Sequence, residues 1–276
     1  MTNYMNQNKT IIEKNDQKLI VQVGLDGVTF CAKNALTQSV VWVKELDFKL
    51  DKTENNVRHL FEQLFEKFPE LHQKYEDIVV LHNNNLSAFV PKSLFDENHI
   101  ADYIKFNTKV YETDAFNFDP IENHDLTLIY IPFIHFNNGF IDYFGSFDYK
   151  HAHAILVTRL LEISKNNLTK KMFVHKQKGL FEIIVIQNQK LLLFNTFEYR
   201  TPEDFIYYIL FTAEQLQMNP ELFCLELLGD ITTDDVYFKI VYQYVRNVNL
   251  LDINLLQEEN IFSIHENLKH FILFYA

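Results

Sequence analysis

A strand-rich pattern that occurs twice along this chain restricts its fold more than any other feature. Residues 171–199 contain three consecutive strand-like segments joined by tight turns, and a helix capped at Thr201 is predicted to follow them. Residues 18–48 repeat the same order of strands and turns before a helix, at an offset of roughly 150 residues. We infer that one α/β unit has been duplicated within the chain.

Each copy continues beyond its helix into one further strand. In the first copy, Asp51 and Glu54 resemble a helix capping box, and residues 78–81 are a continuous apolar run. Such a run is typical of a strand that is buried on both faces and lies parallel to its neighbours. Residues 223–228 take this place in the second copy, before another predicted helix. The repeated order predicts two β-β-β-α-β-α units with mixed sheets.

The same patterns predict the environment of individual residues. The turn between the first two strands contains Gly24 and Gly27, and a tight hairpin turn requires one of them to adopt a positive φ angle. Phe61 and Leu64 lie on the apolar face of the first long helix, so we expect them to face the sheet.

The length of the chain sets the domain organisation that we expect. With 276 residues, of which 47% are hydrophobic, the chain is long enough for two medium domains. We predict a flexible lead-in over residues 1–17, a first domain over residues 18–166 with an inserted segment at 83–125, and a second domain over residues 167–276. Between the two copies we expect two strands and two helices, at residues 87–90, 126–131, 96–106 and 152–163, respectively.

Charge and cysteine content narrow the class of protein. A formal net charge of −12 argues against a general binder of nucleic acids or anionic membranes, because affinity for phosphate depends on Lys and Arg. The sequence shows no signal peptide, and no apolar run approaches the ~20 residues that cross a bilayer. Cys31 and Cys224 lie in predicted strands without a C-x-x-C motif, so we expect buried, unpaired thiols. These features predict a cytoplasmic protein.

The duplicated units resemble the architecture of the actin-like ATPases, in which two ribonuclease-H-like domains face a nucleotide cleft. Three short segments are similar to landmarks of an uncharacterised bacterial (Bacteroidetes-type) family, domain of unknown function 3822: FVPKSLF at 89–95, YIKFN at 103–107 and IYIP at 129–132. The resemblance covers residue 18 to the C-terminus. It implies an actin-like fold and a bacterial source, but no established reaction.

The resemblance also implies where a nucleotide would bind. In actin-like ATPases an Asp ends the first strand and a glycine-rich turn follows, so that backbone amides hold phosphates while the carboxylate organises the Mg²⁺ shell. In this sequence Gln22 stands at the Asp position. Gly24, Asp26 and Gly27 preserve a flexible turn and are candidate nucleotide-binding residues, although Asp26 also fits the role of an ordinary hairpin turn residue.

The second phosphate loop implied by the resemblance carries basic side chains where an actin-like ATPase has a carboxylate. Residues 175–179, HKQKG, contain no carboxylate, whereas Lys176 and Lys178 are candidates for direct contact with an anion, or else solvated turn lysines. Gly229 and Asp230 resemble half of the adenosine-binding Gly-Gly, and equally fit a turn from strand to helix. We therefore take all four as candidate cleft residues.

Motifs for other chemistries give no support to an enzyme. His151 and His153 would lie on one side of an extended segment, but no third metal ligand is evident nearby. No phosphate-loop, nucleophile-elbow or zincin motif occurs in the sequence. We assign no catalytic residue and no metal ligand.

Three functional hypotheses follow. The first is a catalytically degenerate pseudo-ATPase that acts as an interaction or scaffold module, with an unknown protein partner and no cofactor. The second is an ATPase or phosphotransferase with rearranged phosphate loops that binds ATP through Gly24, Asp26, Gly229 and Asp230. The third is a ribonuclease-H-fold nucleic-acid factor with a basic patch of Lys170, Lys171, Lys176 and Lys178. The acidity of the chain argues against the third, and the missing carboxylates favour the first over the second.

Overall fold

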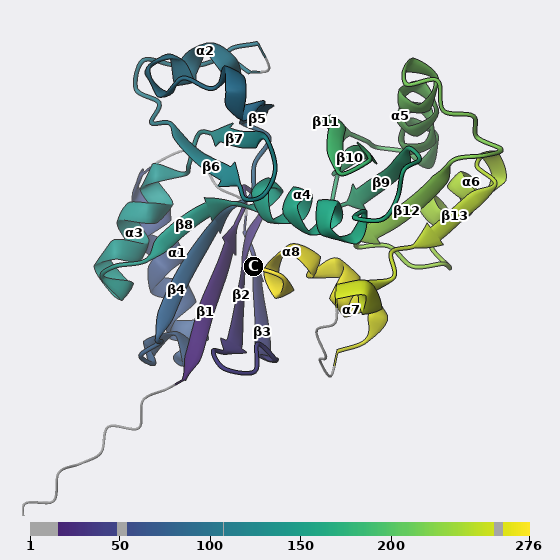
Figure 1. The fold of residues 1–276 in the computed structure, drawn as a ribbon. Helices are drawn as coiled ribbons and strands as arrows, with labels where there is room; N and C mark the ends of the chain where they lie inside the picture. The colour runs from purple at the N-terminus through teal and green to yellow at the C-terminus, as the bar shows by residue number, and fades with distance from the viewer. Residues whose placement is uncertain (1–15, 49–53, 107, 257–261) are drawn as a thin grey trace, which may run out of the picture.

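The computed structural model describes residues 16–48, 54–106, 108–256 and 262–276 and contains two five-stranded sheets (Figure 1). The first sheet has the order β3-β2-β1-β4-β8. Its strands are β1 (Gln17–Val23), β2 (Gly27–Asn34), β3 (Val40–Asp47), β4 (Asp77–His82) and β8 (Asp148–His151). Strands β1, β2 and β3 form an antiparallel meander, whereas β4 lies parallel to β1 and β8 lies parallel to β4.

The second sheet repeats this topology strand for strand. Its order is β11-β10-β9-β12-β13, with an antiparallel meander followed by two parallel strands. The strands are β9 (Lys171–Lys176), β10 (Leu180–Gln187), β11 (Lys190–Glu198), β12 (Cys224–Gly229) and β13 (Asn247–Leu250). The predicted duplication of a β-β-β-α-β unit is confirmed, and we refer to the two sheets with their helices as the first and second domains.

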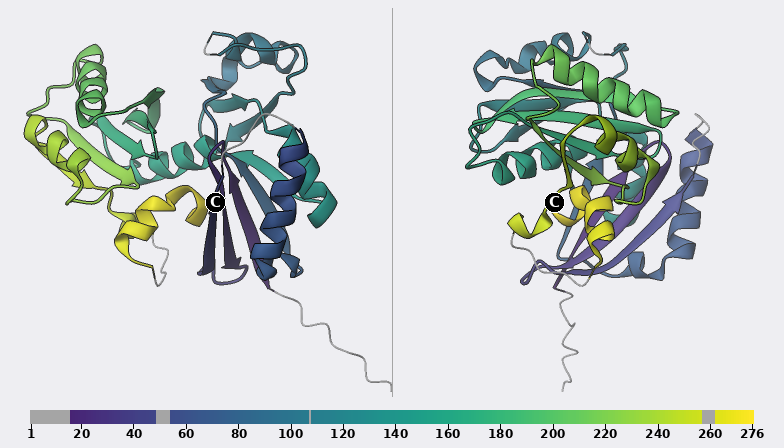
Figure 2. Two further views of the ribbon diagram at one scale, coloured as in Figure 1. Left: turned by 180° about the vertical axis from the view of Figure 1, so that it is seen from behind. Right: turned by 90° about the vertical axis from the view of Figure 1, so that its right-hand side faces the viewer.

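Helices cover the outer faces of both sheets and fill the space between them (Figures 1 and 2). Helices α1 (Glu54–Lys67) and α3 (Ile134–Phe144) pack on the first sheet, and α5 (Pro202–Gln215) and α6 (Val236–Tyr244) pack on the second. Helices α4 (Ala152–Ile163), α7 (Ile264–Lys269) and α8 (Phe271–Phe274) lie between the sheets. Within the described residues, short 3-10 helices cover residues 69–72, 92–94, 97–99 and 253–256.

Local sequence signals explain the helix that begins the second outer layer. Thr201 and Asp204 form a complete capping box at the start of α5, with Pro202 in its first turn. In the first domain, Phe61 and Leu64 are buried against the sheet as predicted. The Asp51 cap proposed for α1 lies outside the described residues.

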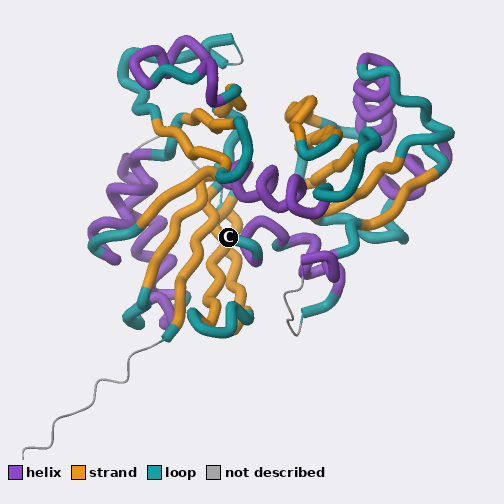
Figure 3. The backbone as a smooth tube through the Cα atoms, viewed as in Figure 1, coloured by secondary structure: helices purple, strands orange, loops and turns teal. Residues whose placement is uncertain are grey.

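The part of the segment between the two copies that contains the strands at 87–90, 117–121 and 126–130 folds into a small subdomain above the first sheet (Figure 3). Its three-stranded sheet has the order β5-β7-β6 and carries the short helix α2. These elements are β5 (Ser87–Val90), β6 (Asn117–Ile121), β7 (Leu126–Tyr130) and α2 (Ile100–Ile104). The strands at 87–90 and 126–131 and the helix at 152–163 were predicted, whereas β6, α3 and β8 were not.

One hydrophobic core extends from the first sheet to the second. It includes Ile20 and Cys31 of the first sheet, Phe173 and Ile184 of the second, and the buried side chains of α4, α7 and α8. Both cysteines are free, as predicted, but Cys224 is only half-buried, unlike Cys31. The two domains therefore share apolar contacts instead of meeting only at a linker. The boundary at residue 167 remains a prediction.

The prediction of a positive φ angle at Gly24 or Gly27 was wrong. The described glycines with positive φ are Gly145, Gly179 and Gly229. Gly27 is needed for a different reason, because a Cβ atom there would lie 2.9 Å from the carbonyl oxygen of Leu46 in β3. The close approach of a neighbouring strand, and not the turn geometry, restricts this position.

Candidate functional site

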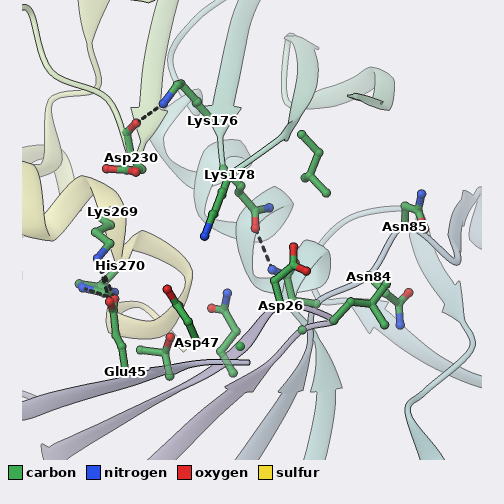
Figure 4. A pocket seen from close by; sticks show the side chains of 18 of the residues that line it. Asp26, Glu45, Asp47, Asn84, Asn85, Lys176, Lys178, Asp230, Lys269 and His270 are labelled. Atoms are coloured by element: carbon green, nitrogen blue, oxygen red, sulfur yellow. Dashed lines mark hydrogen bonds and ion pairs between the residues drawn. The ribbon is translucent and has the colours of Figure 1, made fainter. Parts of the chain in front are cut away.

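A cleft of about 450 Å³ lies between the two domains at the ends of their central strands (Figure 4). Its walls come from the β1–β2 hairpin, the end of β3 and the loop after β4 in the first domain. The β9–β10 hairpin, the end of β11, the turn after β12 and the junction between α7 and α8 complete it. Six of the seven residues predicted from the sequence line this cleft: Gly24, Asp26, Gly27, Lys176, Lys178 and Asp230. Gly229 is the one that does not.

The two hairpins that face the cleft are structural counterparts. The amide of Gly24 donates to the carbonyl oxygen of Gly27 over 2.9 Å, and the amide of Gln177 donates to that of Leu180 over the same distance. The strand register then places His175 in the second domain where Gln22 stands in the first. Neither strand end supplies the carboxylate that a Mg²⁺ shell of the actin-like type requires.

Gly229 has a structural role next to the cleft. Its φ angle is +90°, and a Cβ atom would lie only 2.1 Å from the carbonyl oxygen of Lys176. The amide of Asp230 donates to that same oxygen over 2.9 Å. Gly229 thus allows the end of β12 to bond closely to the end of β9.

The two candidate lysines of the second hairpin differ in availability. Lys176 is buried, and its ammonium donates to the carbonyl oxygen of Asp230 over 2.6 Å and lies 3.5 Å from a carboxylate oxygen of Asp235. The same ammonium lies 4.9 Å from the ring centroid of Tyr237. Lys178 is exposed and points into the cleft (Figure 4), and it has no ion pair among the described residues. Of these two described lysines, Lys178 is the one that presents a free ammonium to a ligand.

The first domain contributes acidic side chains to the cleft. Asp26 and Asp47 are exposed and have no ion pair in the described part of the chain. Glu45 is engaged across the cleft, since its carboxylate lies 2.9 Å from the Lys269 ammonium and 3.2 Å from the His270 ring. Burial lowers the pKa of His270, although the carboxylate of Glu45 opposes that shift.

A buried carboxylate lies beneath the cleft floor. Glu182 of β10 is 1% exposed, and its two oxygens lie 2.8 Å from His175 Nδ1 and 3.4 Å from His153 Nε2. Gln177, which lines the cleft, donates to Glu182 over 2.8 Å and accepts from Asn83 over 2.8 Å. Burial works against ionisation of Glu182, but the hydrogen bonds from His153 and His175 outweigh it and lower its pKa to about 2.

Sequence reasoning missed Glu182 although a signal was available. The segment LFEIIVI has one acid in an otherwise apolar strand, and an acid is almost never fully buried without a partner. A search for that partner would have led to His175, which pairs with Glu182 directly across the two strands. The second partner of Glu182, His153, is distant in sequence, so its contact with Glu182 could not be predicted in this way.

The histidine pair singled out in the sequence lies at the end of a strand. The extended segment stops at His151, the last residue of β8, and His153 belongs to the first turn of α4. His151 Nδ1 accepts a hydrogen bond from the His153 amide over 3.1 Å, so it caps this helix. Burial lowers the pKa of His151 well below its usual value. Within the described ranges, no group of three potential metal ligands occurs.

The basic patch of the nucleic-acid hypothesis is not available as a cluster of free cations. Lys170 donates to the carbonyl oxygen of Leu216 over 2.7 Å, and Lys171 is paired with Glu226 at 2.6 Å. Since Lys176 is also engaged, Lys178 is the one of these four whose ammonium has neither an ion pair nor a hydrogen bond among the described residues. A phosphate backbone would meet one available ammonium.

Comparisons with known proteins support the fold and leave the activity open. The model of a family described as "Protein of unknown function (DUF3822)" matches residues 6–248. A Bacteroides thetaiotaomicron protein with an actin-like ATPase fold and unknown function has 19% identity and a TM-score of 0.77, over 95% of this chain and 97% of that one.

A second solved structure, from the PilM-PilN type IV pilus biogenesis complex, has 10% identity and a TM-score of 0.57, over 94% of this chain and 97% of that one. No curated protein matches the sequence. In the parts of the chain that the structure describes, no helix is long and apolar enough to span a membrane. The fold is thus that of the actin-like ATPases.

Proposed function

We propose that this chain, which belongs to the DUF3822 family of proteins of unknown function, is a non-hydrolysing actin-like binding module whose cleft receives a segment of a protein partner. The observation that carries the proposal is the chemistry of the two strand ends, which hold Gln22 and His175 in place of carboxylates. His175 is moreover buried and bonded to Glu182, so it faces the protein interior and not a ligand.

Phosphoryl transfer depends on metal ions and cations that neutralise the charge developing on the phosphates. The ammonium of the buried Lys176 already donates to Asp230 and lies close to Asp235, so it is not available to a phosphate. A triphosphate in this cleft would meet the free carboxylates of Asp26 and Asp47 with one free lysine to balance them. This arrangement disfavours binding of a nucleotide without a metal ion. It also lacks the strand-end carboxylates that would hold such a metal ion.

A polypeptide fits the same walls better than a nucleotide does. The cleft combines carboxylates, one free ammonium and uncharged amides such as Gln22 and Asn85, which match the mixed donors and acceptors of a peptide. The volume of about 450 Å³ is sufficient for a few side chains. A pilus protein of similar fold occurs in a complex with another protein, which agrees with a role for this fold in protein assembly.

The proposal is tested first with nucleotides. Thermal unfolding of the purified protein is measured with ATP, ADP or GTP, each with and without Mg²⁺. A ligand at ~100 times its dissociation constant stabilises a protein by about 2.7 kcal/mol, which shifts the midpoint by several degrees. We expect no shift with any nucleotide, and a shift that Asp26→Ala or Lys178→Met abolishes would contradict the proposal.

The second test concerns the partner. Proteins that co-purify with the wild-type chain from its source cells are produced singly, and their affinity for the chain is measured by calorimetry. Lys178→Glu reverses the charge of the unpaired ammonium in the cleft and is expected to weaken partner binding at least tenfold. Lys239→Glu, an equal change on the exposed outer surface of α6, is the matched control and is expected to leave the affinity unchanged. Equal affinities for wild type and Lys178→Glu would place the partner elsewhere and refute a cleft-binding role.

A further inference from the structure

From the floor of the cleft inward, a chain of buried and partly buried polar groups connects the first domain to the second. We call this set the hinge network and define it as Asn83, Ser87, His153, His175, Gln177 and Glu182. Asn83, Ser87 and His153 follow β4 or β8 of the first sheet, and the other three belong to the β9–β10 hairpin of the second. Every pair of successive groups is within 3.4 Å, from Asn83 through Gln177 and Glu182 to His153 and Ser87.

Glu182 is the centre of the hinge network because it is the one acid among these groups. Its carboxylate accepts from His175 and Gln177 of its own domain and from His153 of the other. A buried carboxylate is stable only when paired and hydrogen-bonded. Moving the domains apart would remove His153 from Glu182 without a replacement, since both side chains are at most 2% exposed.

Contacts on the other side of the shared core join the same two domains. The buried ammonium of Lys33 in β2 donates to the carbonyl oxygen of Phe274 in α8 over 2.6 Å. Arg159 of α4 donates to the carbonyl oxygen of Tyr275 over 2.9 Å. These cations meet the carbonyl end of the last described helix, where its dipole favours positive charge. The domains are thus held both beneath the cleft and beside it.

We propose that the hinge network is a latch, centred on Glu182, that fixes the angle between the two domains and keeps the cleft as a preformed groove. Enzymes whose domains close around a ligand have a hinge, in which a few residues change their backbone angles at low energetic cost. Between these two domains lie the buried contact of the Glu182 carboxylate with the His153 ring and a continuous apolar core. The latch does not depend on what the cleft binds, so this proposal is independent of the proposed function.

The angle is measured by the distance between spin labels on the two domains of the full chain. Exposed positions Asp142 on α3 and Glu214 on α5 are changed to cysteine, and Cys224 is changed to serine. Cys31 is retained because it is buried, and burial raises the pKa of its thiol to about 12, which makes it unreactive. We expect one narrow distance distribution, and a broad or double distribution in this background would overturn the proposal before any further change.

Glu182→Gln then tests the latch itself. The amide has one acceptor oxygen for three donors and no charge, so the contact to His153 is expected to fail. A second distance population is expected to rise from below about 10% to a level comparable with the first. Unchanged distances in a folded Glu182→Gln protein would refute the proposal.

Two further variants separate the latch from a general loss of stability. Glu226→Gln is the matched control, because Glu226 is also buried but pairs with Lys171 inside the second sheet. It is expected to lower stability without a second distance population, and a distance change as large as that of Glu182→Gln would refute a specific latch. Should Glu182→Gln fail to fold, Asn83→Ala, which removes only the contact to Gln177, is expected to give a smaller second population. A distribution identical to wild type for Asn83→Ala would then count against the latch.

Discussion

The contact between Phe61 of α1 and Gly139 of α3 makes a quantitative prediction about the core of the first domain. Phe61 is 1% exposed, and its ring lies edge-on to Phe140 at a centroid distance of 4.7 Å. Truncation of a buried Phe costs about 3–5 kcal/mol, so Phe61→Ala is expected to destabilise the protein by that amount.

Gly139 allows the ring of Phe61 to lie directly on α3. A Cβ atom at Gly139 would be 2.4 Å from Cε2 of this ring, so Gly139→Ala forces a buried side chain to move. Such overpacking costs about 1–3 kcal/mol. The better helix propensity of Ala offsets about 1 kcal/mol of it, which leaves a net cost of about 0–2 kcal/mol in the wild-type background.

The two substitutions are therefore expected to be coupled. With Phe61→Ala in place the clash is gone, and Gly139→Ala is expected to stabilise the protein by about 1 kcal/mol. Urea unfolding followed by circular dichroism, for the wild type, both single variants and the double variant, gives the coupling energy. Additive effects, or an unchanged midpoint for Phe61→Ala, would refute this description of the packing.

Three further predictions concern the surroundings of the cleft. Gly229→Ala is expected to cost at least about 2 kcal/mol in urea unfolding, because it combines a positive φ angle with a backbone clash. Lys176→Met is expected to cost about 1–3 kcal/mol through the lost bond to Asp230, whereas Lys178→Met stays within about 0.5 kcal/mol, and equal effects would contradict the assignment of the buried cation. Burial lowers the pKa of His82 to about 4, so the unfolded chain binds its proton first as the pH falls. About 3 kcal/mol of stability is then lost between pH 6.5 and 4, and His82→Gln is expected to remove that part of the pH dependence.

Much of the fold was predictable because its signals are local. The cap at Thr201, the apolar face around Phe61 and the order of the meander strands can each be read from a short window. Helix α3 has no comparable signal, because Gly139 and its neighbouring asparagines have low helix propensity, and the contact of Gly139 with Phe61 of α1 cannot be read from the local sequence. The four-residue strands β8 and β13 are too short to show a periodic pattern.

The candidate site was predictable in position but not in chemistry. The sequence located both hairpins and the turn at Asp230, and the structure brings them to one cleft. Which lysine is free depends on Asp235 and Tyr237, whose side chains approach Lys176 only in the folded domain. The pairing of Glu182 with His153 depends on the contact between the domains, which no single segment encodes.

The measurement that tests the account most directly is Mg²⁺-dependent release of phosphate from ATP by the purified protein, compared with Asp26→Ala and Asp230→Ala. The structure places both carboxylates in the cleft but no carboxylate at the strand-end positions of Gln22 and His175. We predict no release above the protein-free background, and the same rate for the wild type and both variants. Turnover that requires Mg²⁺ and disappears in either variant would contradict the account and establish an active ATPase.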